Sequence, residues 1–244
     1  MEEGDVKLSN DKKEYKIKIV ENGPYIVSGN VPLSEKIIVP KGKSYELKEG
    51  RELPQSEKYA LCRCGKSKNP PFCDGTHAKI GFVGTETASK EKYKDRAELR
   101  GGPVVDLLDD HRCALARFCH RETGDAWELT RASDNEANRK EALQAANECP
   151  SGRITAVIKP GEVIEPELEP SIEIVQDPEK GVSAGIFVKG NIPIESADGQ
   201  IYEIRNRVAL CRCGQSENKP FCDARHVSTE YFDGKGKLPE ISID

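Results

Sequence analysis

The sequence predicts an α+β protein in which two β-rich repeats flank a small helical insert. Residues 62–77 and 211–226 agree at 11 of 16 aligned positions without a gap, and every cysteine and the final histidine coincide. Short β-prone runs precede both segments, and a helix-forming stretch occupies residues 133–148 between them. Because two copies are too few for a solenoid, we expect the repeats to pack face to face within one chain.

The runs before each segment have the pattern of short strands separated by turns. They are rich in Ile, Val and Tyr between Gly, Pro and Asn: YKIKIV, YIVSG and KIIVP in the first copy; SIEIV, GIFVKG and IYEIR in the second. GNVPL at 29–33 matches GNIPI at 190–194, but Cys62 follows Gly29 by 33 positions whereas Cys211 follows Gly190 by 21, a difference of 12. This extra piece, around SEKIIVPKGKSYEL, is predicted to add a strand pair or hairpin.

The insert contains one clear helix signal. Ser133 and Glu136 have capping-box spacing, helix-forming residues follow, and Pro150 and Gly152 end the pattern. The acidic, proline-rich PGEVIEPELEP that comes next has the composition of a linker. The predicted domains are 14–90 for the first repeat, 95–160 for the insert, 161–171 for the linker and 172–244 for the second repeat.

Composition and charge argue against several classes of function. Of the 244 residues 32% are charged and 36% hydrophobic, and the net charge of −5 gives no basis for binding nucleic acid or an anionic membrane. No apolar run approaches the about 20 residues of a membrane span, and MEEGDVKLSNDKKEYK at the N-terminus lacks the apolar core of a secretory signal. We therefore expect a cytoplasmic protein.

The nine cysteines fall into three sets of three. An odd count in a chain of cytosolic type argues against a disulfide framework and favours metal ligands. The sets are Cys62, Cys64 and Cys73; Cys113, Cys119 and Cys149; and Cys211, Cys213 and Cys222.

In both repeated segments a cysteine and a histidine stand four residues apart. Cys73 and His77, like Cys222 and His226, would lie about 5–6 Å apart on one helical turn, which suits two ligands of one metal. The Cys-x-Cys pair supplies the other two ligands. A single tetrahedral zinc accepts three cysteines and one histidine, and a 2Fe-2S cluster accepts the same set as two pairs, one for each iron. The Cys-x-Cys spacing is tighter than the usual zinc pairs and favours the cluster.

The pattern Cys-x-Cys-x2-Ser-x3-Pro-x-Cys-Asp-Gly-x-His resembles the CDGSH iron-sulfur family, also called NEET proteins. The first segment fits it fully, whereas in the second Ala224 replaces the glycine and Arg225 follows. The resemblance implies two 2Fe-2S clusters. Its ligands would be Cys62 and Cys64 on one iron with Cys73 and His77 on the other, and Cys211, Cys213, Cys222 and His226 in the same arrangement. Because the family fold is a β-rich dimer, two copies in one chain imply an intramolecular pseudo-dimer that is monomeric in solution.

The histidine ligand predicts pH-sensitive clusters. A neutral imidazole in place of a thiolate raises the reduction potential, and a ring nitrogen that is protonated near the reference pKa of about 6.5 cannot bind iron. Arg225 beside His226 disfavours a second positive charge, so we expect the second cluster to survive to lower pH. The alternative is that Arg225 only faces solvent.

The middle segment carries Cys113, Cys119 and Cys149. Cys-x5-Cys, a helix and then Cys-Pro-Ser-Gly resemble the divergent single-cluster ferredoxin-type domain. Three thiolates suit a 3Fe-4S centre, or a 4Fe-4S centre with one other ligand, for which His120 is a candidate, with His111 and Asp110 nearby; the alternative is that His120 is an ordinary solvated histidine. A straight helix would place Cys113 and Cys119 about 9 Å apart, so a shared cluster requires a loop or bend. The alternative is three buried thiols without metal.

These features predict an electron-transfer protein that works with a protein redox partner. The alternatives are storage or transfer of iron-sulfur clusters to an apo-acceptor, redox sensing, and a structural zinc protein. We do not expect an enzyme, because the sequence contains no glycine-rich phosphate loop and no acid-base or nucleophile constellation.

Overall fold

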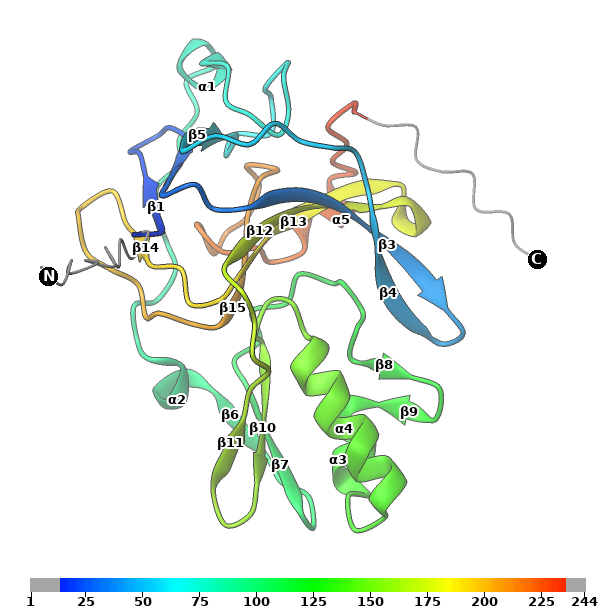
Figure 1. Ribbon diagram of the computed structural model, residues 1–244. Helices are drawn as coiled ribbons and strands as arrows, with labels where there is room; N and C mark the ends of the chain where they lie inside the picture. The colour runs from blue at the N-terminus through cyan, green and yellow to red at the C-terminus, as the bar shows by residue number, and fades with distance from the viewer. Residues whose placement is uncertain (1–13, 236–244) are drawn as a thin grey trace, which may run out of the picture.

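The computed structural model describes residues 14–235, which form an α+β protein with three main sheets (Figure 1). The N-terminal stretch MEEGDVKLSNDKKEYK, which lacks the apolar core of a secretory signal, lies mostly outside these residues, as do positions 236–244 of the second predicted domain. No helix within residues 14–235 has the length and apolar character needed to cross a membrane.

Both repeats consist of short strands that end in a cysteine segment. The first contains β1 (Lys16–Ile19), β2 (Tyr25–Ser28), β3 (Leu33–Lys41), β4 (Ser44–Glu49), β5 (Lys58–Leu61), α1 (Thr76–Lys79) and α2 (Tyr93–Arg96). The second contains β12 (Ser171–Asp177), the 3-10 turn η1 (Pro178–Lys180), β13 (Val182–Lys189), β14 (Ile194–Glu195), β15 (Arg207–Leu210) and α5 (Arg225–Ser228). The alternating apolar residues of β1 and β2 face the interior, as their period of two predicts.

The repeats exchange strands. One sheet has the order β14-β1-β2-β5 and contains one strand of the second repeat; the other has the order β15-β13-β12-β3-β4 and contains two strands of the first. The exchanged pairs are parallel, with Ile17 opposite Ile194 and Leu33 opposite Ile172. Gly29 precedes β3 with a φ of 95°, and a Cβ there would lie 2.6 Å from the carbonyl oxygen of Glu14. Only glycine fits this crossing of the chain.

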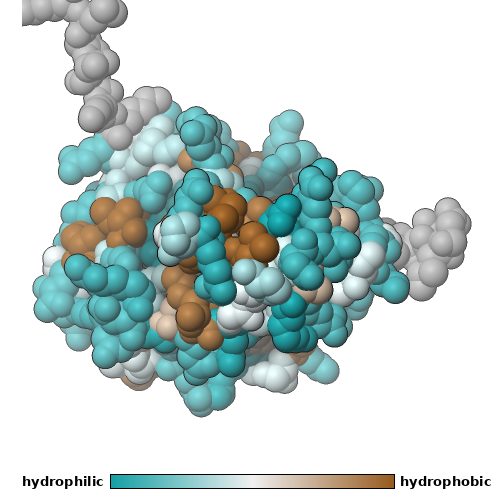
Figure 2. Space-filling view, turned by 90° about the horizontal axis from the view of Figure 1, so that it is seen from below, coloured by the Kyte–Doolittle hydropathy of each residue, from teal (hydrophilic) through white to brown (hydrophobic). Residues whose placement is uncertain are grey.

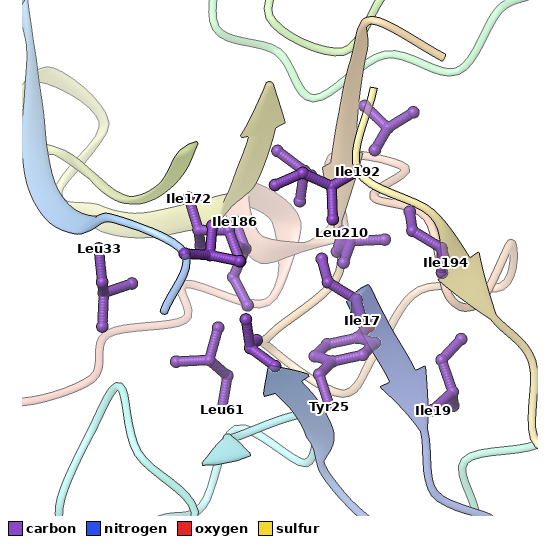
Figure 3. Packing of buried hydrophobic residues seen from close by; sticks show 14 of the residues in the cluster. Ile17, Ile19, Tyr25, Leu33, Leu61, Ile172, Ile186, Ile192, Ile194 and Leu210 are labelled. Carbon is purple, nitrogen blue, oxygen red and sulfur yellow. The ribbon is translucent and has the colours of Figure 1, made fainter. Parts of the chain in front are cut away.

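One apolar core joins the two sheets (Figure 3). Ten of its residues are Ile17, Ile19, Tyr25, Leu33, Leu61, Ile172, Ile186, Ile192, Ile194 and Leu210. Because they come from both repeats, neither repeat buries its apolar face alone.

The 12 extra residues of the first repeat do form a hairpin. β3 pairs with β4 from Lys36 opposite Glu49 to Lys41 opposite Ser44. This hairpin continues the sheet of the second repeat, beyond the exchanged part of β3 (Figure 1).

The insert is not only helical, which corrects the sequence prediction. It contains β6 (Glu98–Arg100), β7 (Val105–Asp109), β8 (His120–Arg121), β9 (Gly124–Asp125), α3 (Ala126–Arg131), α4 (Glu136–Glu148), β10 (Ile154–Ile158) and β11 (Glu162–Ile164). Four of the strands form an antiparallel sheet in the order β11-β10-β7-β6, against which α3 and α4 pack. The strands have only three to five residues, so their alternation was too short to be recognised.

The linker predicted at 161–171 is partly structured as well. β11 lies within it and pairs with β10, and Glu165 just after β11 forms an ion pair with Arg207. Charge and proline content did not reveal this structure, because it depends on two partners outside the segment. β10 supplies the hairpin hydrogen bonds, and the buried Arg207 pairs with the charge of Glu165.

The predicted cap of the long helix also differs. Asn135, not Ser133, is the N-cap of α4, and its side chain accepts hydrogen bonds from the amides of Ala137 and Asn138. Ser133 is fully buried, and its hydroxyl accepts hydrogen bonds from the amides of residues 104 and 105. The spacing of Ser133 and Glu136 fits a helix N-cap, but it is equally compatible with the buried role that Ser133 has here, so the sequence could not distinguish the two roles.

Hydrophilic residues cover most of the face seen in Figure 2, with hydrophobic patches between them. This face is the lower end of Figure 1, where the insert lies. Leu99 on β6 and Val163 on β11 are exposed apolar residues of the insert.

Candidate metal centres

The first cysteine segment is a loop closed by backbone hydrogen bonds. The amide of Cys62 donates to the carbonyl of Pro71, and the amide of Cys73 donates to that of Ala60. Leu61 at the end of β5 also forms a bridge with Phe72. These contacts bring the two ends of the loop together at the edge of the sheet.

The four potential ligands of this loop form two pairs. The sulfurs of Cys62 and Cys64 are 3.7 Å apart, and Cys73 Sγ lies 3.3 Å from His77 Nδ1. Two ligands of one tetrahedral metal with bonds of about 2.3 Å lie about 3.7 Å apart, so each pair suits one metal ion. Only His77 lies on a helical turn, because the chain reverses at Gly75, where φ is 83°, before α1 begins.

The second loop repeats this geometry. The sulfurs of Cys211 and Cys213 are 3.5 Å apart, and Cys222 Sγ lies 3.5 Å from His226 Nδ1. Ala224 takes the left-handed conformation of the missing glycine, with a φ of 67°. The substitution therefore keeps the arrangement of the ligands.

A serine and an aspartate hold each loop. Ser67 Oγ donates to the carbonyl of Phe72, and Ser216 Oγ donates to that of Phe221. The carboxylate of Asp74 accepts hydrogen bonds from two backbone amides, those of residues 68 and 76, and Asp223 accepts those of residues 217 and 225. The aspartates satisfy amides at the start of each short helix, as their position in the sequence predicts.

The arginine between the two cysteines of each loop was missed at the sequence level. Arg63 and Arg212 are each 2% exposed. Arg63 donates to the carbonyls of Val20, Gly23 and Gly84. The sequence did offer one signal, since both copies have an arginine at this position. A lone arginine is, however, normally a surface residue.

Arg212 donates to the carbonyls of Val175 and Ala184 and forms an ion pair with Asp233 at 2.6 Å. The two arginines thus tie the Cys-x-Cys turns to strands and to the chain beyond the short helices.

Each Cys-x-Cys pair favours one thiolate. A hydrogen bond with Cys64 lowers the pKa of Cys62 to about 6, against the effect of burial, and the amides of Ser67 and Gly65 contribute. Cys213 lowers the pKa of Cys211 to about 6 in the same way. Thiolates are the form that binds metal, so the lowered pKa of one thiol in each loop favours ligation.

The two loops touch each other. A Cβ at Gly214 would lie 2.6 Å from the carbonyl oxygen of Cys64, and a Cβ at Gly65 would collide with that of Cys213. Tyr25 Oη also donates to the carbonyl of Cys211 at 2.8 Å. The Cys-x-Cys turns of the two repeats are therefore in backbone contact.

Burial distinguishes the two loops. Cys73 and His77 are half-buried, whereas Cys222 and His226 are buried. Cys222 packs in one apolar cluster with Ile38 of β3 and with three residues of the insert, Ala114, Ala116 and Phe118. The extra hairpin of the first repeat and the insert therefore cover the second loop.

Burial and then Arg212 lower the pKa of His226 to about 4. Asp177 and Asp223 act in the opposite direction, and Arg117 adds to the lowering. Arg225, which the sequence singled out, is instead 42% exposed and pairs with Glu217 and Asp223. The expectation that the second site survives to lower pH therefore rests on burial and Arg212, not on Arg225.

The three cysteines of the insert line one hollow, together with Trp127, Ser151 and Arg153. Burial raises the pKa of Cys119 to about 12, and Cys149 and Cys113 add to the effect. The loop before Cys119 is not helical, because His111, Leu115 and Arg117 take positive φ values of 63°, 53° and 67°. The bend that a shared cluster requires is confirmed.

The structure does not bring a histidine to this hollow. His120 is exposed on β8, and His111 is exposed and lies 3.4 Å from Glu98. Asp110 is held by Arg96 at 2.9 Å. Ser151 is a polar side chain of the hollow, and its Oγ lies 3.5 Å from Cys149 Sγ.

Among residues 14–235 no three His, Cys, Asp or Glu side chains converge closely enough to hold a single metal ion. The donors of the two loops are instead paired, and those of the insert are spread around a hollow.

Comparisons with known families identify both kinds of segment. The family described as iron-binding zinc finger, CDGSH type, matches residues 22–78 and 184–227. The family described as divergent 4Fe-4S mono-cluster matches residues 101–159. Neither curated proteins nor solved structures give a match.

The burial of His226 predicts different acid sensitivity at the two loops. With His77→Cys only His226 stays acid-labile, and with His226→Cys only His77 does. Because the lowered pKa keeps the His226 imidazole neutral in stronger acid, visible absorbance in His77→Cys should be lost at a pH at least about one unit lower than in His226→Cys. Coincident acid-loss curves for the two variants would contradict this.

The buried Arg212 predicts a large loss of stability on its removal. Arg212→Met leaves the fully buried carboxylate of Asp233 without its cation and should cost about 3–5 kcal/mol of unfolding free energy. The exposed Arg225→Met, its control, should cost about 0–1 kcal/mol. Urea denaturation followed by circular dichroism measures both, and equal losses would show that Arg212 has no special role.

Proposed function

We propose that this chain, a tandem CDGSH-type iron-sulfur protein with a divergent 4Fe-4S mono-cluster segment between its repeats, carries single electrons between protein partners. It does so without a substrate of its own, and therefore not as an enzyme. We place it in the cytoplasm, with neither nucleic acid nor membrane as a partner; its net charge of −5 supports the absence of both.

Each CDGSH-type loop holds one 2Fe-2S cluster in this proposal. Cys62 and Cys64 bind one iron and Cys73 and His77 the other, and the second loop repeats the set with Cys211, Cys213, Cys222 and His226. The separations of 3.3–3.7 Å within the pairs support it. When bound, such a cluster supplies reversible one-electron chemistry. The chain contributes neutral imidazoles and backbone N–H groups directed at the thiolates, both of which favour the more negative, reduced state.

Cys113, Cys119 and Cys149 hold a third cluster, of the 3Fe-4S or 4Fe-4S type. The shared hollow and the non-helical loop support this assignment. No histidine lines the hollow in the described part of the chain. This favours a 3Fe-4S centre, which three thiolates satisfy without a further ligand from the protein.

Contact between the three cysteine-containing loops is the observation that best supports a function in electron transfer. The Cys-x-Cys turns of the two repeats meet at Gly65 and Gly214, and the cysteine loop of the insert packs against Cys222. Cys113 even adds to the raised pKa of Cys222. The second loop thus lies between the other two sites, which is the order that a relay of electrons requires.

We also propose that the repeats form an intramolecular pseudo-dimer and that the chain is monomeric. The reciprocal exchange of β3 and β14 supports this, since each sheet is already completed by the other repeat. The surface that a two-chain dimer would bury is thereby used within one chain.

Storage, transfer or sensing of clusters is the second candidate. The half-buried Cys73 and His77 favour it, because an accessible, protonatable ligand lets a cluster leave. In that case an apo-acceptor protein replaces the redox partner. The role of structural zinc protein is the remaining alternative.

Metal analysis combined with redox titration tests the proposal. Anaerobically purified protein should contain about four irons per chain with the paired sites loaded, and seven or eight with the insert loaded. Reduction by dithionite should bleach the visible absorbance and produce EPR signals that return on reoxidation. Colourless protein with stoichiometric zinc would contradict the proposal, as would cluster transfer to an apo-ferredoxin without reversible reduction.

A further inference from the structure

The surface around the first loop differs in charge from that around the second. Lys66, Lys68 and Lys79 are exposed, and their counterparts in the second copy are Gln215, Glu217 and Ser228. These three lysines take no part in the ion pairs formed within residues 14–235. The sequence matches the two loops closely at the ligands but not on their outer faces.

The balance of charge makes this difference explicit. Apart from the buried arginine, residues 62–79 carry three lysines against Asp74, a net charge of +2. Residues 211–228 carry Lys219 and Arg225 against Glu217 and Asp223, a net charge of 0. The first loop is thus a basic face on a chain whose net charge is −5.

An apolar area lies next to these lysines. Ile80 is 50% exposed and Val83 is 71% exposed, directly after the helix that carries His77. The counterpart of Ile80 is Thr229, whereas Phe232, the counterpart of Val83, is also exposed. Redox encounter surfaces combine a small apolar centre with a charged rim, and the first loop has both.

The candidate ligands of the first loop are also more accessible than those of the second. α1 buries none of its residues and projects from the upper end of the molecule, whereas α5 packs on β13 (Figure 1). The β3–β4 hairpin and the insert cover only the second loop. A partner can therefore approach Cys73 and His77, but not Cys222 and His226.

We infer that the first loop is the docking face for an acidic one-electron carrier protein, with Lys66, Lys68 and Lys79 as the rim around Cys73 and His77. This rests on the proposed electron transfer. Opposite potentials raise the rate of encounter and orient the partner, so that its redox group meets the exposed end of the relay. One electron passes between the partner and the first site, and no bond forms or breaks.

The test replaces the basic face by the residues of the second copy. The triple variant Lys66→Gln, Lys68→Glu, Lys79→Ser changes the net charge by −4. The matched control Lys43→Gln, Lys94→Glu, Lys140→Ser changes it equally on exposed lysines of the β3–β4 turn, α2 and α4, away from α1 (Figure 1). Iron content and visible absorbance establish that both proteins are loaded.

Stopped-flow rates then compare the variants. Reduced plant-type ferredoxin, an acidic carrier, should reduce the triple variant about tenfold more slowly than the control at low ionic strength. Added salt should slow the wild-type protein and the control but leave the variant nearly unchanged. With basic cytochrome c as the electron acceptor, the reduced variant should be no slower than the control.

Dithionite, which needs no docking face, separates the two proposals. If it does not reduce the loaded wild-type protein reversibly, the electron-carrier function is wrong. If it reduces all the proteins equally while ferredoxin shows the same rate and salt dependence with the variant and the control, the docking face is wrong and the electron-carrier function stands.

Discussion

The parallel pairings of β1 with β14 and of β3 with β12 are the constraint on which the rest of this structure depends. They join the two repeats through one shared core and bring the two Cys-x-Cys turns into backbone contact. Neither loop has a complete support without the other repeat. Because the exchange occurs within one chain, it needs no association between separate chains.

A single insertion breaks the symmetry that the repeats would otherwise have. The 12 extra residues extend β3 and add β4 only in the first repeat, and this hairpin lies in the sheet of the second. Together with the insert it encloses Cys222 and His226, whereas Cys73 and His77 have no such cover. Two nearly identical sets of candidate ligands thus lie in different dielectric surroundings, one set in the interior and one accessible to solvent.

Arg63 and Arg212 connect the chemistry of each site to the fold. A buried guanidinium is costly unless its donors are satisfied, and here carbonyls from separate strands and loops supply the acceptors. The same residue ties the Cys-x-Cys turn to these strands and loops. In the second repeat Arg212 also contributes to the lowered pKa of His226, so one side chain there serves both the fold and the electrostatics of the site.

The sequence by itself determined the repeat, the extra hairpin and the candidate ligand residues, because the spacing of such residues and short-range turn chemistry are local properties. It did not reveal the strands of the insert, the buried role of Ser133 or the distance of His120 from the hollow. These depend on partners far along the chain. The tertiary structure alone decided which loop is covered and why His226 stays neutral. Burial arises from packing between distant segments. The exposed Arg225 beside His226 has little influence on the pKa of that histidine.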